Sequence, residues 1–154
     1  EVDVLLDKLI REAYPEVDVP ISRMRNFKES YSYVGENETG VRVKVPVEGK
    51  PRKIEIGKQV GESCNGLLNE VFQSLKTVIS KASPQSVFDM LQNIILTGGG
   101  SRIRGIDQEL QRMLVDDGYE DPDVSISSKD VMPFVAIGAL KVAKAAREDQ
   151  WIQV

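Results

Sequence analysis

One short segment constrains the fold more than any other part of this sequence. Ile94-Ile95-Leu96 is a continuous apolar run of strand length, and Gly98-Gly99-Gly100 follows one residue later. Beyond the glycines comes a helical pattern, with apolar positions at Ile106, Leu110, Met113 and Leu114. A strand that turns through glycines into a helix is the first part of a βαβ unit. The second half therefore predicts a parallel sheet, with 93–97 as a strand buried on both faces.

The remaining elements of the second half fit the same class. Val124-Ser125-Ile126 predicts another strand. The final segment, 131–146, is apolar almost all round, so we expect a helix that lies centrally in the core.

The first half has a different pattern. Apolar residues at helical spacing predict a helix over 2–13, ended at Tyr14-Pro15, and a second over 22–34, with Ser22 as its N-cap and Gly35 after its end. Residues 41–47 alternate with period two, and Pro46 indicates an edge strand.

A hairpin and a long helix complete this half. Glu48-Gly49-Lys50-Pro51 predicts the turn, and the returning strand is expected from Ile54. A long helix then carries Cys64 and continues to about Ala82, and Ser83-Pro84 predicts the start of a short helix. This half is therefore a small α+β lobe inserted into the α/β domain.

Composition excludes several classes of function. The 154 residues carry a net charge of −4, without the basic excess typical of nucleic-acid binding. No histidine is present, which removes imidazole catalysis and histidine metal sites, and the single cysteine, Cys64, is expected to be a buried thiol. No apolar run is long enough to span a membrane, and the first residues resemble no signal peptide. Because the chain opens without Met in a helical pattern, we expect a segment from within a longer protein.

The glycine segment is the first candidate site. Glycine lets a flat ligand or a phosphate approach the backbone without meeting a Cβ, and a helix N-terminus offers free N–H groups. The segment matches neither the dinucleotide fingerprint nor the P-loop. The alternative is a structural strand-to-helix turn without a ligand.

One face of the second helix is the other candidate. Arg25, Lys28, Glu29 and Ser32 share a polar stripe, opposite Met24, Phe27 and Tyr31. Such a face could hold a ribose and an adenine, and the alternative is an ordinary solvated face with an internal ion pair.

Together these segments resemble the actin, Hsp70 and sugar-kinase superfamily. The run from Ile94 to Ile106 is similar to its adenosine motif, and Thr97-Gly98-Gly99-Gly100-Ser101 is similar to bacterial actins of the MreB and MamK type. Arg25-x-x-Lys28-Glu29-x-x-x-Tyr33-Val34 resembles the actin segment that reaches the nucleotide from the opposite lobe, and 134–139 resembles the terminal helix. The resemblance covers essentially the whole chain.

It implies an α/β, actin-like (ribonuclease H-like) half-domain, with a mostly parallel sheet and an inserted lobe containing a β-hairpin. In the family's terms, residues 1–20 are a helix of subdomain IIA. Residues 21–82 are the small lobe, subdomain IIB, with its return helix, and residues 83–154 are the adenosine-motif part of IIA. The chain would be the C-terminal portion of the family's domain pair.

The resemblance also implies a set of nucleotide-binding residues. It assigns the sugar and the α/β-phosphate edge to Gly98, Gly99 and Gly100, and the cover over adenine and ribose to Lys28 and Glu29. Arg102 stands where Hsp70 relatives stack an arginine on adenine, and Ile103 where actins usually place an aromatic residue. Arg25 is a weaker candidate, and Met132 lies near a position where actins carry lysine.

Two departures from the family limit the chemistry. Neither Asp-x-Gly-Thr/Ser-x-x-Thr nor Asp-x-Gly-x-Gly-Thr, the two phosphate loops, occurs in the sequence. We therefore expect no catalytic residue and no metal ligand in this chain, and ATP or ADP with Mg²⁺ in the parent protein. The acidic residues of 116–123 match no EF-hand spacing and predict a solvated loop.

The implied function is the adenosine-binding portion of a bacterial actin-like ATPase that polymerises into cytoskeletal filaments, in the cytoplasm, with a magnetosome-organising role as one option. Self-association is the implied partnership; nucleic acid is not expected, and membranes or organelles would be reached through other proteins. Three alternatives stay open. A sugar-kinase relative conflicts with the small lobe at 41–56. An Hsp70-type relative is favoured by Arg102 but disfavoured by Lys28-Glu29. The third is an interaction module that binds no nucleotide.

Overall fold

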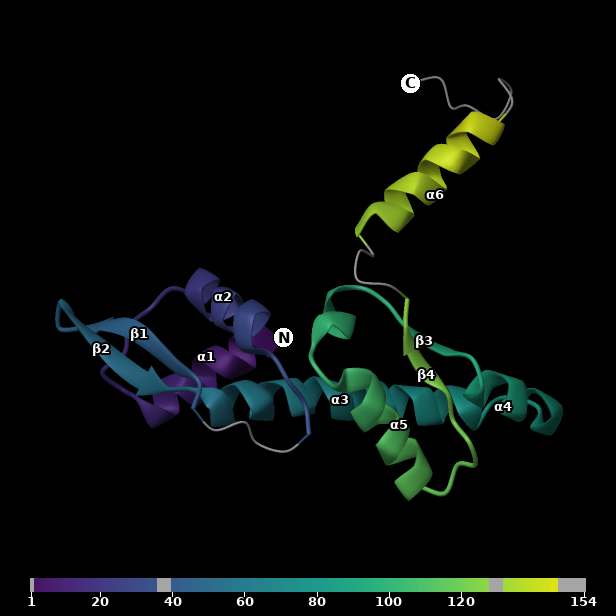
Figure 1. Ribbon diagram of the computed structural model, residues 1–154, viewed down its shortest axis with the longest axis horizontal. Helices are drawn as coiled ribbons and strands as arrows, with labels where there is room; N and C mark the ends of the chain where they lie inside the picture. Colours follow the sequence, from purple (N-terminus) through teal and green to yellow (C-terminus); the bar gives the residue numbers. More distant parts are fainter. Residues whose placement is uncertain (1, 36–39, 128–131, 147–154) are drawn as a thin grey trace.

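The computed structural model describes residues 2–35, 40–127 and 132–146, without the side chains of 132–135. The molecule is elongated, and helix α3 (Gly57–Ile79) runs along its centre (Figure 1). Around the first half of α3 lie α1 (Val2–Ala13), α2 (Ile21–Tyr31) and the strands β1 (Arg42–Val47) and β2 (Lys50–Glu55). Around its second half lie α4 (Pro84–Leu91), β3 (Ile94–Leu96), the 3-10 turn η1 (Gly99–Arg102), α5 (Ile106–Asp116) and β4 (Val124–Ile126), and α6 (Met132–Ala145) follows.

The hairpin forms with the predicted alternation but with a tighter turn. β1 and β2 pair antiparallel from Arg42↔Glu55 to Val47↔Lys50, so the turn is Glu48-Gly49 alone and β2 begins at Lys50. Both turn residues have positive φ, 48° and 75°, as a two-residue hairpin turn of the primed type requires. Pro46 and Pro51 oppose each other, each on an edge strand, where a missing N–H costs no ladder bond.

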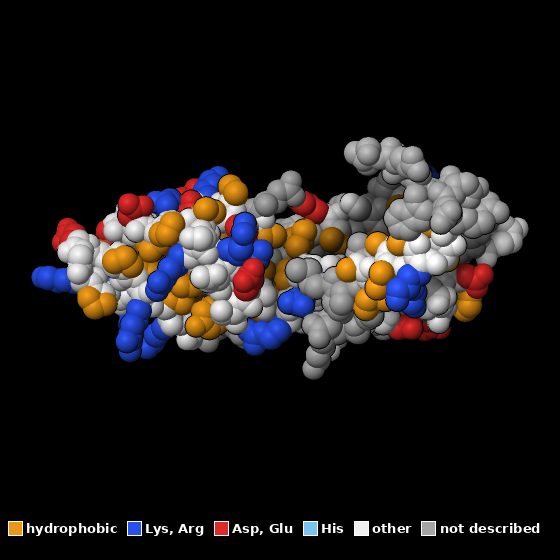
Figure 2. All heavy atoms as spheres, turned by 90° about the horizontal axis from the view of Figure 1, so that it is seen from above, with side chains coloured by type: hydrophobic (Ala, Val, Ile, Leu, Met, Phe, Trp, Pro, Cys, Tyr) orange, Lys and Arg blue, Asp and Glu red, His pale blue; other side chains and the backbone are white. Residues whose placement is uncertain are grey.

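The two faces of this hairpin differ as the alternation predicts. Val43, Val45 and Ile54 are buried against the helices. The hairpin end of the surface is basic (Figure 2), with exposed side chains of Arg42, Lys44, Lys50, Arg52 and Lys53.

Helix α2 differs from its predicted bounds at both ends. It begins at Ile21 after Pro20, and Ser22 is not its cap. It ends at Tyr31, because the backbone of Ser32 is extended and the next residues pair with a distant segment. Tyr33 forms a parallel bridge with Arg104, and the N–H of Val34 donates to the carbonyl of Arg104 at 3.1 Å.

The second sheet is parallel, as predicted, but exposed on one face. β3 pairs with β4 from Ile94↔Val124 to Leu96↔Ile126. Ile95, in the middle of β3, is 61% exposed, so the expectation of a strand buried on both faces is wrong for this chain. The apolar run is typical of a strand that is covered on both faces, whereas the described residues cover only one face of β3.

Helix α6 also departs from expectation. It projects away from the other elements (Figure 1), and Ile137, Leu140 and Val142 are exposed, so it is not central to the core. A helix that is apolar almost all round needs packing partners. The pattern does not show whether those partners belong to the same chain segment.

The core extends along α3 and includes the cysteine. Cys64 is fully buried, as predicted, and burial raises the pKa of its thiol. No helix among residues 2–35, 40–127 and 132–146 is long and apolar enough to cross a bilayer.

Candidate functional site

The glycine turn starts directly after β3. Gly98 has φ 84° and ψ −172°, a conformation that L side chains rarely adopt. The chain then closes into η1, where the hydroxyl of Ser101 donates to the carbonyl of Gly98 at 2.8 Å. Helix α5 begins later than the glycines suggest, at Ile106, after Gly105 with φ 76°. The segment behind the glycines is therefore a single 3-10 turn, and the N-terminus of α5 lies one turn further along the chain.

Gly99 is the residue of this turn that the fold does not explain. Its φ lies outside the left-handed region, and a Cβ placed on it would meet nothing within 4 Å. A Cβ on Gly100 would only touch Leu67 Cδ2 at an ordinary 3.6 Å. Among the described residues, no acceptor takes the N–H of Gly99 or Gly100. The turn thus presents open space and backbone donors, the arrangement that a phosphate or a sugar edge uses.

The polar face of α2 is held by a residue that the sequence did not single out. Asp3 of α1 pairs with both cations: Oδ1 lies 2.7 Å from Lys28 Nζ, and Oδ2 accepts a hydrogen bond from Arg25 Nε at 3.3 Å. Glu29, on the same face, is exposed. The predicted stripe is therefore divided: its cations turn towards α1, and its carboxylate stays in solvent.

The two candidate segments are joined through the backbone. Besides the Val34–Arg104 bond, the N–H of Arg104 donates to the carbonyl of Ser32 at 3.4 Å. The end of α2 and the end of η1 are thus neighbours, although 72 residues separate Ser32 from Arg104. The structure brings the two segments together at this point and leaves Glu29, Gly98 and Gly99 exposed and Gly100 half-buried.

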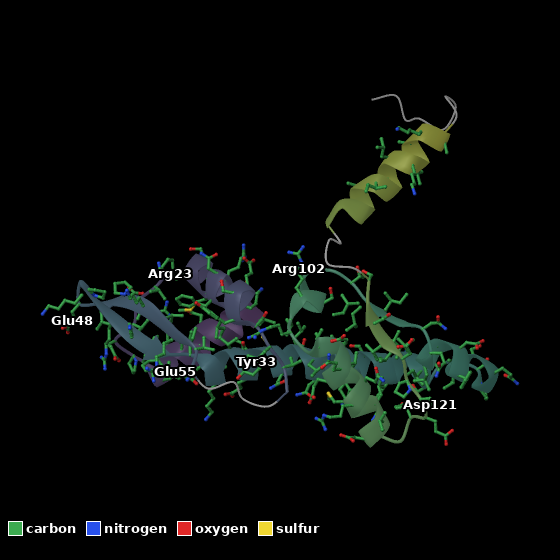
Figure 3. All side chains as sticks on the ribbon, viewed as in Figure 1. Arg23, Tyr33, Glu48, Glu55, Arg102 and Asp121 are labelled. Atoms are coloured by element: carbon green, nitrogen blue, oxygen red, sulfur yellow. The ribbon has the colours of Figure 1, made fainter. Side chains whose placement is uncertain are left out.

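Two further predicted residues differ in access. Arg102 is exposed on η1 and points outward (Figure 3). Ile103 is 5% exposed and belongs to the core, so little of it is open to a ligand. Met132 begins α6, but its side chain lies outside the described residues.

A close contact between Tyr33 and Gly61 joins the segment after α2 to helix α3. The buried hydroxyl of Tyr33 donates to the carbonyl of Gly57 at 3.0 Å. A Cβ on Gly61 would lie 2.5 Å from that hydroxyl oxygen, so the ring packs on the bare backbone of α3. Sequence reasoning missed both contacts; the glycine inside a helical pattern was the available signal.

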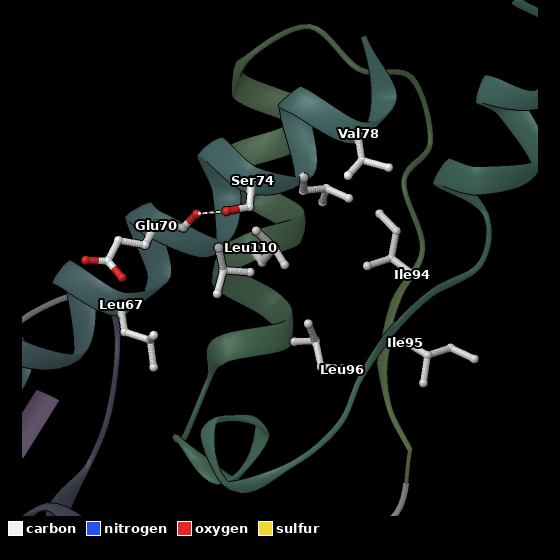
Figure 4. A pocket seen from close by; sticks show the side chains of 10 residues that line it. Leu67, Glu70, Ser74, Val78, Ile94, Ile95, Leu96 and Leu110 are labelled. Atoms are coloured by element: carbon white, nitrogen blue, oxygen red, sulfur yellow. Dashed lines mark hydrogen bonds between the residues drawn. The ribbon is translucent and has the colours of Figure 1, made fainter. Parts of the chain in front are cut away.

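A groove of about 450 Å³ lies beside the site rather than in it. It runs between α3, β3 and α5 and is almost entirely apolar (Figure 4). Its few polar groups are occupied or peripheral: the Ser74 hydroxyl, for example, donates to the Glu70 carbonyl at 2.8 Å. An apolar groove with no convergent donors is a packing surface rather than a small-molecule site.

The acidic segment after α5 shows ordinary surface pairing. Asp116 accepts Arg112 at 2.6 Å, and Asp117 accepts Lys76 at 2.8 Å. In the part of the chain that the structure describes, no group of three or more acidic or cysteine side chains could hold a metal ion.

Comparison with known proteins places this geometry in a family. The family model described as MreB/Mbl protein matches residues 1–150. The actin-like protein MamK of Paramagnetospirillum magneticum is 29% identical over 154 residues, which cover 99% of this chain and 43% of that relative. The chain thus spans less than half the length of the curated relatives that it matches along its whole extent.

Solved structures agree. A MamK double helical filament superposes with a TM-score of 0.84 at 28% identity, over 95% of this chain and 44% of that one. A non-polymerising MamK mutant bound to AMPPNP gives 0.81 at 29% identity, over 93% and 43%. The predicted actin-like fold class is confirmed, and the kinase and Hsp70-type alternatives are not favoured. The chain belongs to the MreB/Mbl family of bacterial actin-like proteins.

Proposed function

We propose that this chain is the C-terminal, adenosine-binding portion of an actin-like ATPase that polymerises into filaments. The observation that carries the proposal is the open space at Gly99, where neither backbone conformation nor packing requires a glycine. A ligand that approaches the backbone closely would explain why a glycine stands at this position.

Each side of the site has its own role in this proposal. The backbone of Gly98–Gly100 takes the sugar and the α/β-phosphate edge of ATP or ADP, with the free N–H groups of Gly99 and Gly100 as donors. Glu29 accepts ribose hydroxyl hydrogens, and Lys28 lies beside it over the nucleoside. Exposed Arg102 offers a planar cation for stacking on adenine.

Structures of relatives support both nucleotide binding and filament formation. One MamK structure is bound to AMPPNP, and another is a double helical filament. Bound Mg²⁺ neutralises phosphate charge during phosphoryl transfer. The described residues gather no acidic cluster for it, so the ligands would come from other segments of the full-length protein, together with the phosphate loops. We therefore expect the isolated chain to release no phosphate from ATP. The proposed filament is cytoplasmic.

The test is ATP titration of the full-length protein, with melting curves recorded without nucleotide. Gly99→Val should abolish measurable binding because its side chain fills the ligand's space, and Gly99→Ala should weaken binding less. Glu29→Ala should lower the affinity roughly five- to thirtyfold, for about 1–2 kcal/mol of lost ribose hydrogen bonds. All three variants should melt like the parent. If Gly99→Val binds ATP normally, the turn is structural and the proposal is wrong.

Filament formation gives an independent check. Polymerisation of the full-length protein should require ATP, because the nucleotide would join two domains and favour one arrangement of them. Equal pelleting with and without ATP, at the same salt concentration, would contradict an actin-like mechanism.

A further inference from the structure

Within the described part of the chain, Asp3 is the acidic partner of both Arg25 and Lys28, the two cations of the α2 face. Its two oxygens are divided between them: Oδ1 lies 2.7 Å from Lys28 Nζ, and Oδ2 lies 3.3 Å from Arg25 Nε. These contacts connect α1 to α2, unlike the i,i+4 pairs Lys8–Glu12 and Arg11–Asp7 on α1 itself.

This cluster is partly shielded from water. The Asp3 side chain is 17% exposed and the Lys28 side chain 27%, whereas Arg25 is largely open to solvent. Burial alone would favour the neutral acid, but the hydrogen bonds and charges of Lys28 and Arg25 outweigh it and lower the pKa of Asp3. Asp3 is therefore a carboxylate at neutral pH and keeps its negative charge beside the two cations.

The Asp3–Lys28 contact also leaves Lys28 able to bind. An ammonium carries three N–H donors. The carboxylate of Asp3, 2.7 Å from Nζ, occupies one side of the head group and leaves its other sides open to a ligand. At its far end α2 is held by the Ser32–Arg104 and Val34–Arg104 backbone bonds. Two contacts at different points along a helix fix its rotation as well as its position.

We propose that Asp3 is a positioning residue for the nucleotide site: it orients Lys28 and fixes the rotation of α2, and so sets how Lys28 and Glu29 meet the nucleoside. The inference rests on the proposed function and adds a residue that the family resemblance did not supply. It assigns Asp3 no direct contact with nucleotide.

The experiment is a double-mutant cycle on ATP affinity in the full-length protein. Asp3→Asn and Lys28→Met should each lower the affinity roughly five- to tenfold, the loss typical of one hydrogen bond. Because Asp3 acts through Lys28, adding Asp3→Asn to Lys28→Met should lower the affinity no further. Asp3→Glu keeps the carboxylate and should recover most of the affinity. Asp7→Asn on the same helix, whose partner is Arg11, is the matched control and should bind like the parent.

Three outcomes would overturn the inference. Asp3→Asn could bind ATP like the parent, in which case the cluster serves stability alone and only the melting temperature falls. It could bind ATP more tightly, in which case Asp3 competes with the nucleotide for Lys28. Its effect could persist in the Lys28→Met background, in which case Asp3 acts independently. Gly99→Val distinguishes these results from a failure of the proposed function. If that variant binds ATP normally, the nucleotide does not bind at the glycine turn and the proposed function is wrong.

Discussion

The two small sheets of this chain have the same number of strands and opposite surroundings. The β1–β2 hairpin buries Val43, Val45 and Ile54 on its inner face, against helices that the same half of the chain provides. The parallel β3–β4 pair packs one face on α5 and leaves Ile95 exposed on the other.

This difference shows which sheet has its apolar side chains covered by the described residues. An antiparallel hairpin can keep one face in solvent, and its alternating sequence provides for that, whereas parallel strands are normally covered on both faces. Relatives more than twice as long as this chain superpose with it, so we expect the exposed apolar face of β3 to be covered in the full-length protein. The following predictions test that contrast, from the largest expected effect to the smallest.

Ile54→Ala should cause the largest loss. Ile54 is 3% exposed on β2, and its removal leaves a cavity in the closed face of the hairpin. We expect the free energy of unfolding to fall by about 3 kcal/mol, measured by urea titration of the 154-residue chain. A loss below about 1 kcal/mol would mean that the hairpin is no better packed than β3–β4.

Gly61→Ala should cost about 2 kcal/mol, although alanine is the better helix former. The new Cβ would overlap the buried ring of Tyr33, which its hydroxyl bond to Gly57 holds in place. Gly66→Ala, five residues further along α3, is the control. Its Cβ would meet only Leu5 Cδ2 at 3.4 Å, so we expect no loss and a gain of up to about 1 kcal/mol. Equal losses for the two variants would contradict the proposed close contact at Gly61.

Acid should weaken the first half through Asp3 more than the second half through Glu109. The Arg112 hydrogen bond lowers the pKa of Glu109, and Lys28 and Arg25 lower that of Asp3 against the effect of burial. Carboxyls with a lowered pKa bind protons more weakly in the folded state, so their stabilisation is complete above about pH 5 and is lost as the pH falls below about 4.

Substitution separates the two carboxylates. Asp3 joins two helices, whereas Glu109 and Arg112 are neighbours on α5. The free energy of unfolding of the parent should fall between pH 6 and pH 3. In Asp3→Asn this fall should be smaller by about 1 kcal/mol, and in Glu109→Gln it should be smaller by only a few tenths of a kcal/mol. The check is urea titration of each variant at both pH values. A larger effect of Glu109→Gln would reverse the comparison.

Ile95→Ala should have the smallest effect in the 154-residue chain. Ile95 occupies the middle of β3 but is 61% exposed, so its removal should cost only about 0.5 kcal/mol. In the full-length protein the same substitution should cost about 2 kcal/mol or more, because the face would be covered. Equal small losses in both proteins would show that the open face of β3 stays exposed.

Local pattern was sufficient for most of the elements. The alternation of 41–47 and the helical spacing around Cys64 predicted a hairpin strand and α3, because one face of each is buried by its neighbours in the chain. The apolar run before the glycines predicted β3 and its parallel pairing. The glycine motif also carried the resemblance to the actin superfamily, which the family match confirms.

Contacts between distant residues decided what the pattern could not. The helical spacing through Val34 favours a longer α2, but pairing of Tyr33 and Val34 with Arg104 ends the helix at Tyr31. The division of the α2 face depends on Asp3, which no spacing within α2 reveals.

The sequence by itself determined which segments of this protein form helices and which form strands, and it predicts where a ligand could approach the backbone. Periodicity and glycine act within a few residues, so a single chain segment contains the information. The tertiary structure decided that Gly99 is open while Ile103 is buried, that Asp3 holds Lys28, and that Ile95 and α6 are exposed. Each of these depends on which distant surface is present to make the contact, and that is a property of the assembled molecule.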